Sequence, residues 1–105
     1  MGDIGKRFPD TDDRYLGADS VELLREVGRM LTDAGYRLGN LDATVIAQRP
    51  KLAPYIDEMR KNIAGALDTD VKNVSVKATT EEHLGFTGAG AGIAAHAVCL
   101  IEARP

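Results

Sequence analysis

The stretch LDATVIAQRPKLAPYIDEMRKNIAGALDTDVKNVSVKA (residues 41–78) decides the fold. Its first part, residues 41–48, is apolar enough to predict a strand that is buried on both faces, since such strands are nearly continuous hydrophobic runs. Apolar side chains then recur at helical spacing through residues 56–67, which leaves charged residues such as Arg60 to face water. Residues 74–78 alternate apolar and polar side chains, which predicts a half-buried strand. The stretch therefore predicts a strand, a helix and a strand, in that order.

A further helix is expected before this stretch. Apolar residues recur at helical spacing over residues 23–34, and Asp19 or Ser20 can serve as the N-cap. Gly35 is suited to end the helix, because glycine adopts a positive φ without a Cβ clash. Gly28 lies inside the helix, where glycine costs up to ~1 kcal/mol relative to alanine. We therefore expect close packing at Gly28, against the sheet.

The C-terminal part adds a turn and a third strand. Residues 85–92 (GFTGAGAG) are glycine-rich and predict a tight turn, and residues 93–102 predict a strand. The order helix, strand, helix, strand, strand predicts an α+β fold with two helices on one face of a small sheet. With no internal repeat and no linker, residues 1–105 are expected to form a single domain. The exposed edges of such a sheet invite pairing with other chains, so we expect an oligomer or a missing piece.

Composition excludes several classes of function. The chain has 105 residues, of which 44% are hydrophobic and 28% charged, an ordinary balance for a soluble globular domain. A net charge of -3 and only five aromatic residues, three Tyr and two Phe, argue against a nucleic-acid partner. No apolar run approaches the ~20 residues that span a bilayer, so no membrane partner is expected. The single Cys99 cannot form an internal disulfide, which favours a cytoplasmic location, and it is expected to be a small core residue.

An acidic segment near the N-terminus is the first candidate site. Asp3, Asp10 and Asp12 lie in a loop rich in glycine and proline. Three carboxylates in a loop can bind a hard cation or a pair of ribose hydroxyls. Their spacing does not match a calcium-binding loop. A solvated acidic loop with turn-forming aspartates remains the alternative interpretation.

Two other candidates follow predicted strands. Residues 47–52 (AQRPKL) lie where a strand passes into a helix, and the backbone amides of that helix start, together with Lys51, would favour an anion. Residues 77–82 (KATTEE) place two hydroxyls beside a carboxylate, a combination that binds phosphate oxygens and a divalent cation. A plain turn with surface cations and a Thr-rich strand end are the respective alternatives.

The glycine run and the two histidines are weaker candidates. The run GAG at residues 88–90 does not predict a dinucleotide-binding loop, because that loop must open a helix and a strand follows here. Neither His83 nor His96 has a second His or Cys at ligand spacing. A zinc site built from this chain alone is therefore not expected.

Taken together, the motifs resemble one family, 2-C-methyl-D-erythritol 2,4-cyclodiphosphate synthase. The resemblance covers essentially the whole chain. The matching stretches are GDIGKRFPDTD (2–12), GADSVELLRE (17–26), GYRLGNLDATVIAQRPKLAPYIDEMR (35–60) and VSVKATTEEHLGFTG (74–88).

The resemblance implies an enzyme of isoprenoid (terpenoid) biosynthesis by the non-mevalonate pathway. Such lyases convert 4-diphosphocytidyl-2-C-methyl-D-erythritol 2-phosphate into the cyclodiphosphate and CMP, through attack of the 2-phosphate on the diphosphate. Members are homotrimers of ferredoxin-like subunits with active sites between neighbours, in the cytoplasm or in plastids. They use zinc together with magnesium or manganese, and metals suit a reaction that must bring two anionic phosphates together.

The same resemblance assigns roles to residues of this chain. The residues expected to contact the ribose are Asp3, Ile4 and Gly5. Those expected to form a mobile loop over the methylerythritol part are Phe8, Pro9, Asp10, Thr11 and Asp12. Those expected to hold the cytosine with backbone groups are Ala47, Gln48, Arg49, Pro50, Lys51, Leu52 and Ala53. Those expected to bind phosphate are Thr79, Thr80, Glu81 and Glu82, with Thr80 as the catalytic, transition-state-stabilising residue and Glu82 as a ligand of the second cation. Phe86 matches a residue that lines the substrate region.

Two departures from the family pattern qualify this assignment. The family's N-terminal part, which carries the zinc ligands, is absent from this sequence, so we expect an incomplete, truncated domain that is not active alone or needs a missing N-terminal fragment. Ala89 and Ala91 stand where the family commonly has Arg and Glu. A non-catalytic or engineered trimeric scaffold that keeps the fold is the alternative function.

Overall fold

The fold is α+β, as the sequence predicts. The computed structural model describes residues 19–48, 51–80, 82–88, 90 and 92–105. The principal elements are two helices and three strands: α2 (Ser20–Asp33), β1 (Tyr36–Ile46), α3 (Ile56–Ala66), β2 (Val74–Thr79) and β3 (Ala94–Ala103). Short helical turns complete them: η2 (Ala53–Tyr55), η3 (Val71–Asn73) and α4 (Gly85–Gly88).

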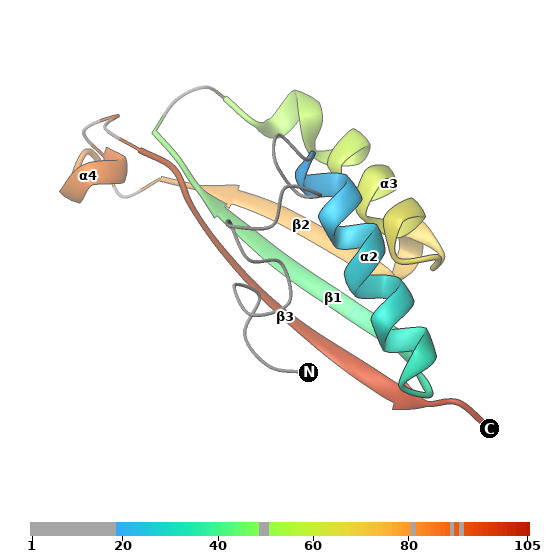
Figure 1. Ribbon diagram of the computed structural model, residues 1–105. Coiled ribbons are helices and arrows are strands. Elements are labelled where there is room, and N and C mark those ends of the chain that lie inside the picture. The colour runs from blue at the N-terminus through green and yellow to red at the C-terminus, as the bar shows by residue number, and fades with distance from the viewer. Residues whose placement is uncertain (1–18, 49–50, 81, 89, 91) are drawn as a thin grey trace.

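The three strands form one sheet in the order β2-β1-β3. β1 pairs with β2 in parallel and with β3 antiparallel. Figure 1 shows α2 and α3 side by side on one face of this sheet, which confirms the predicted arrangement. None of the described helices is long and apolar enough to cross a membrane.

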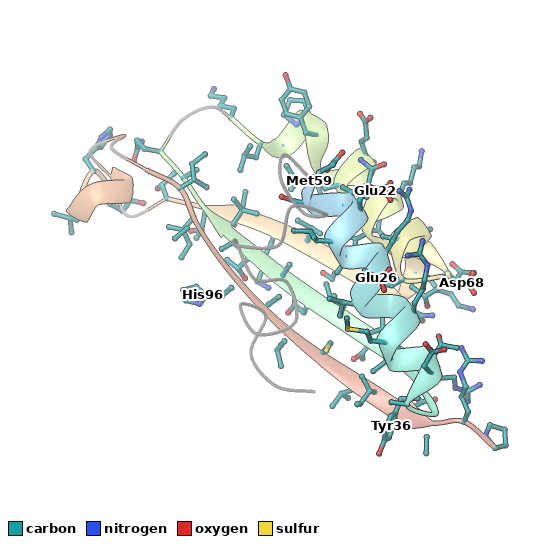
Figure 2. All side chains as sticks on the ribbon, in the orientation of Figure 1. Glu22, Glu26, Tyr36, Met59, Asp68 and His96 are labelled. Carbon is teal, nitrogen blue, oxygen red and sulfur yellow. The ribbon has the colours of Figure 1, made fainter. Side chains whose placement is uncertain are left out.

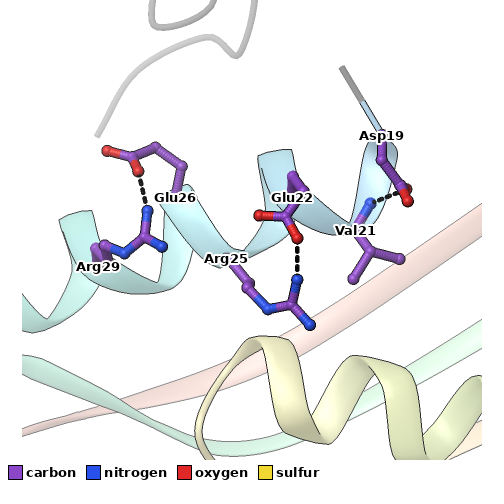
Figure 3. A network of polar contacts seen from close by, with 6 residues as sticks. All are labelled: Asp19, Val21, Glu22, Arg25, Glu26 and Arg29. Atoms are coloured by element: carbon purple, nitrogen blue, oxygen red, sulfur yellow. Dashed lines mark hydrogen bonds and ion pairs between the residues drawn. The ribbon is translucent and has the colours of Figure 1, made fainter. Parts of the chain in front are cut away.

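The start of α2 is fixed by side chains that satisfy its first turn. The Asp19 carboxylate accepts a hydrogen bond from the Val21 amide at 2.9 Å, so of the two N-cap candidates, Asp19 and Ser20, Asp19 is the cap. Two ion pairs one turn apart follow along the helix (Figure 3), Glu22 with Arg25 and Glu26 with Arg29. Gly35 follows the helix with φ 89°, which confirms its predicted role as the terminating residue.

The close packing expected at Gly28 is confirmed, but its partner is α3 and not the sheet. A Cβ at this position would lie 3.2 Å from the Ala66 carbonyl oxygen and 3.5 Å from Leu67 Cδ2. Gly28 therefore faces the C-terminal end of α3, because the two helices cross closely above the sheet. Glycine is needed there for helix–helix contact.

The hydrophobic core lies between the helices and one face of the sheet. Its buried members are Ala64, Val74 and Val76. Partly buried side chains pack around them: Leu41, Ala43, Val45, Ile56, Met59, Ile63 and Val71. In β2 the alternation of buried valines with exposed Ser75 and Lys77 confirms the half-buried strand.

The prediction that residues 41–48 are buried on both faces is wrong. Asp42 is exposed between the core-facing Leu41 and Ala43, because both helices lie on the same side of the sheet. β1 also begins earlier, at Tyr36, and an irregularity in its pairing with β3 falls around Gly39. A Cβ at Gly39 would lie 3.2 Å from the Leu100 carbonyl oxygen, so glycine permits the strand to continue through this bulge.

β3 is an edge strand whose side chains lie largely in solvent. Cys99, expected in the core, is exposed. The helices contact β1 and β2 but do not extend over β3, which leaves even its helix-facing side uncovered. On the opposite face, Val98 and Leu100 are 68% and 65% exposed, and Figure 2 shows His96 on the same side, away from the helices.

The glycine-rich segment contains a helical turn in place of the predicted tight turn. Residues Gly85–Gly88 form α4, and the Gly88 amide donates to the Leu84 carbonyl at 3.1 Å. A Cβ at Gly88 would lie 2.5 Å from the His83 carbonyl carbon. The missing side chain thus lets the backbone of α4 lie directly against the preceding turn.

Arg60 does not simply face water as its place in the helical pattern suggested. Its Nε donates to the Val74 carbonyl at 2.8 Å and its Nη2 to the Val71 carbonyl at 3.1 Å. Its Nη1 lies 3.5 Å from Asp57. The guanidinium therefore ties α3 to η3 and to the first residue of β2.

Replacement of Arg60 by alanine is expected to lower the free energy of unfolding by about 2 kcal/mol, since hydrogen bonds from a charged donor contribute roughly 1.5–3 kcal/mol. Urea denaturation would measure this change. Lys61→Ala is the matched control, because Lys61 is exposed on the same helix. Equal stability of the two variants would contradict the role given to Arg60.

Candidate functional site

The candidate site lies where the parallel strands β1 and β2 end together. Their register pairs Ile46 with Thr79, and the Ala47 amide donates to the Thr79 carbonyl at 3.1 Å. Loops at the carboxyl ends of neighbouring parallel strands are the usual place for ligands in α/β sheets. The structure thus brings two separately predicted segments, residues 47–53 and residues 79–82, to one edge of the sheet.

A hollow of about 220 Å³ lies between these two loops. Its lining comes from both strand ends and from the approach to α3: Ala47, Gln48, Lys51, Leu52, Ala53, Ala78, Thr79 and Thr80. Seven of these eight have a role assigned from the sequence, and Ala78 lies in the candidate segment 77–82 without a role of its own. Three of the lining side chains, those of Ala47, Ala53 and Ala78, are small.

The chain between this hollow and α3 favours an anionic ligand. Lys51 is exposed at the rim, and the 3₁₀ turn at Ala53–Tyr55, with Pro54 near its start, leads directly into α3. The Tyr55 and Ile56 amides already donate to preceding backbone carbonyls, and Pro54 has no amide hydrogen, so the positive charge at this place is that of Lys51. A phosphate group in the hollow would therefore meet a cationic side chain on a neighbouring loop.

The turn after β2 carries the other polar groups of the site. The Glu82 amide donates to the Thr80 hydroxyl at 3.4 Å, and the His83 amide donates to the Gln48 side-chain oxygen at 3.3 Å. Glu82 and His83 have φ values of 53° and 64°, a backbone region that residues other than glycine seldom adopt. Glu82 and Thr80 are both exposed, so a carboxylate and a hydroxyl are available to a ligand from one turn.

Part of the predicted site lies outside the described residues. This group comprises the N-terminal positions and three loop positions: Asp3, Ile4, Gly5, Phe8, Pro9, Asp10, Thr11, Asp12, Arg49, Pro50 and Glu81. The side chain of Phe86 and the positions of Ala89 and Ala91 are likewise not described. Their roles stay predictions from the sequence.

The described residues do not supply a metal centre by themselves. Among them, no group of three or more His, Cys, Asp or Glu side chains could hold a metal ion. His83 lies in the turn after β2, whereas His96 pairs with Thr44 on β3. A structural or catalytic zinc needs three or four ligands together, so the described residues do not fit zinc.

Larger hollows lie away from the strand ends, including one of about 350 Å³ beside Gly28 and Leu67. One of about 410 Å³ lies against the sheet and includes Asp42, Val98 and Leu100. Another, of about 570 Å³, lies at the opposite end of β1, where Arg37 pairs with Glu102 at 3.1 Å. Size alone does not identify a site, and the smaller hollow is the one in which the predicted residues converge.

Comparison with known proteins supports the resemblance seen in the sequence. The sequence model of the YgbB family matches residues 1–102. The 2-C-methyl-D-erythritol 2,4-cyclodiphosphate synthase of Lachnospira eligens is 62% identical over 102 residues, which are 97% of this chain and 56% of that protein.

Solved structures share the fold. The bifunctional IspDF from Campylobacter jejuni superimposes with a TM-score of 0.91 and 41% identity, over 97% of this chain and 28% of that chain. The CDP complex of IspF from Plasmodium falciparum has a TM-score of 0.85 and 32% identity, over 100% of this chain and 62% of that chain. The chain spans between 56% and 65% of the length of five curated relatives that it matches.

Proposed function

The chain belongs to the YgbB family, and from that membership we propose that it carries the nucleotide-binding part of a cyclodiphosphate synthase site. The whole protein would convert 4-diphosphocytidyl-2-C-methyl-D-erythritol 2-phosphate into 2-C-methyl-D-erythritol 2,4-cyclodiphosphate and CMP. In that reaction a phosphate oxygen forms a new bond to phosphorus while the bond to CMP breaks. The cytoplasm is the proposed location, as the sequence suggests.

One observation carries this proposal. The described residues of the loop 47–53 and the end of β2 with Thr80 line one hollow, although 25 residues, 54–78, lie between the two candidate segments 47–53 and 79–82 in the sequence. A nucleoside diphosphate has a flat base and a charged diphosphate, which need two kinds of surface. The first loop offers backbone groups and Lys51, and the turn offers hydroxyls and a carboxylate.

The residues of the hollow then take separate roles in binding. The backbone between Ala47 and Ala53 would hold the cytosine, and Thr79 and Thr80 would donate hydrogen bonds to phosphate oxygens. Fixed donors align the attacking and leaving groups, and donors that strengthen as charge develops lower the barrier. We assign the second task to Thr80, which directly follows β2 and lines the hollow.

The proposal assigns no role to zinc and one to a magnesium or manganese ion. Zinc does not fit the described residues, so no step is assigned to it. A magnesium or manganese ion needs only one or two protein carboxylates when substrate phosphates complete its shell, and the exposed Glu82 can supply one. Such an ion would neutralise phosphate charge during attack.

Calorimetry with CDP and with cytidine tests the nucleotide site. We expect CDP to bind the chain, and Lys51→Ala to weaken CDP binding about two- to fivefold at low salt, the range of one exposed ionic contact. The loss should shrink as salt rises, because an exposed charge is screened. Cytidine, which has no phosphate, should lose less affinity.

Lys61→Ala serves as the control for charge, because Lys61 is equally cationic but lies further along α3. It should leave the CDP affinity within error of the original chain. Absence of CDP binding at millimolar concentration would contradict the proposed function. If the chain then still assembled into an oligomer, the scaffold alternative would be favoured.

We also propose that the chain is a homotrimer of ferredoxin-like subunits whose open sheet faces pack together. The face opposite the helices exposes the apolar side chains Val98 and Leu100 beside Asp42 and Asn40. A monomer of this size buries a modest core, and burial of that face would add to it. The three-stranded sheet with one uncovered face supports this assembly.

Val98→Asp is expected to convert the oligomer to a monomer, because it would bury a charge in the apolar contact. Sedimentation equilibrium would give the mass of each species. Tyr55→Ser is the control, since Tyr55 is a 54% exposed aromatic residue on the helix side of the molecule. A monodisperse monomer for the unsubstituted chain would contradict the trimer.

A further inference from the structure

The Gln48 side chain links the two loops of the candidate site. It extends from the end of β1, and its Oε1 accepts the His83 amide at 3.3 Å across 35 residues of sequence. Among the side-chain hydrogen bonds found for residues 79–83, this is the one that reaches the other loop; the remaining two stay within the turn. This hydrogen bond therefore couples the position of the loop after β1 to that of the turn after β2.

The turn that Gln48 holds has an uncommon backbone. Glu82 and His83 are consecutive residues with φ of 53° and 64°, a region disfavoured by side chains with a Cβ. Such a conformation persists only where surrounding contacts over-determine it. Three contacts do so here: Gln48 with the His83 amide, Thr80 with the Glu82 amide, and Gly88 against the His83 backbone.

We infer that Gln48 is a positioning residue, which sets the Thr80 hydroxyl and the Glu82 carboxylate for the phosphate groups of the bound nucleotide. This inference rests on the proposed function. Gln48 acts through the His83 amide rather than by touching the phosphates. Its loss should therefore impair recognition of the diphosphate more than recognition of the nucleoside.

Gln48→Met tests the contact, because methionine keeps the length of the side chain and removes the acceptor. The hydrogen-exchange rate of the His83 amide, read by nuclear magnetic resonance, should rise about three- to tenfold, the range for loss of one hydrogen bond. Gln48→Glu keeps an acceptor oxygen at the same reach and should restore the slow rate. An unchanged rate in Gln48→Met would overturn the inference.

The same variants are then titrated with CDP and with cytidine. In Gln48→Met the ratio of the CDP affinity to the cytidine affinity should fall about three- to tenfold. A parallel loss of both affinities would mean that Gln48 merely supports the loop, and would overturn its positioning role. If the unsubstituted chain binds no CDP, the proposed function fails, whereas the amide measurement still decides whether Gln48 holds the turn.

Gly88→Ala is a second variant that perturbs the same turn, through the contact of Gly88 with the His83 backbone. It keeps the inference testable if a Gln48 variant fails to fold. The added Cβ would lie 2.5 Å from the His83 carbonyl carbon, so the turn must shift. It should change the His83 amide signal and lower the CDP-to-cytidine ratio as Gln48→Met does. Gly65→Ala is the matched control, because nothing lies within 4 Å of the added methyl. A Gly88→Ala chain with an unchanged ratio would overturn the inference.

Discussion

The parallel pairing of β1 with β2 is the constraint on which the rest of the structure depends. Parallel neighbours need a crossover connection, and α3 supplies it while covering the face that Val74 and Val76 bury. The same register, from Leu41 opposite Val74 to Ile46 opposite Thr79, brings both strands to an end at one edge. Fold and candidate site are therefore consequences of a single set of backbone hydrogen bonds.

Because the described helices cover only one face of the sheet, many side chains of the sheet are exposed. The helices cover β1 and β2, so apolar side chains of β3 remain exposed, and the ion pair between Lys77 and Asp42, at 2.7 Å, lies on the open face. Arg60, near the middle of α3, donates to the Val71 and Val74 carbonyls and so joins the helix to η3 and β2. A sheet with one dry and one open face is well suited to pack against further protein.

Much of the fold could be predicted from local patterns, because those patterns reflect physics acting within a few residues. The N-cap Asp19, the terminating Gly35 and the alternation around Val74 and Val76 were all recognisable in the sequence and are confirmed. Errors arose where the partner was distant. Gly28 meets the end of α3 rather than the sheet, and Cys99 is exposed because the described helices α2 and α3 pack mainly over β1 and β2.

The sequence by itself determined the classes of element, the family and the residue types of the candidate site, since composition, periodicity and motif are properties of adjacent residues. Only the tertiary structure decided that the chain after β1 and the end of β2 line one hollow, and that the Gln48 side chain accepts the His83 amide. Neither the strand register nor the contact between Gln48 and His83, which are 35 residues apart in the sequence, can be recognised from a pattern of adjacent residues. They follow from which backbones pair, and that is settled when the whole sheet forms.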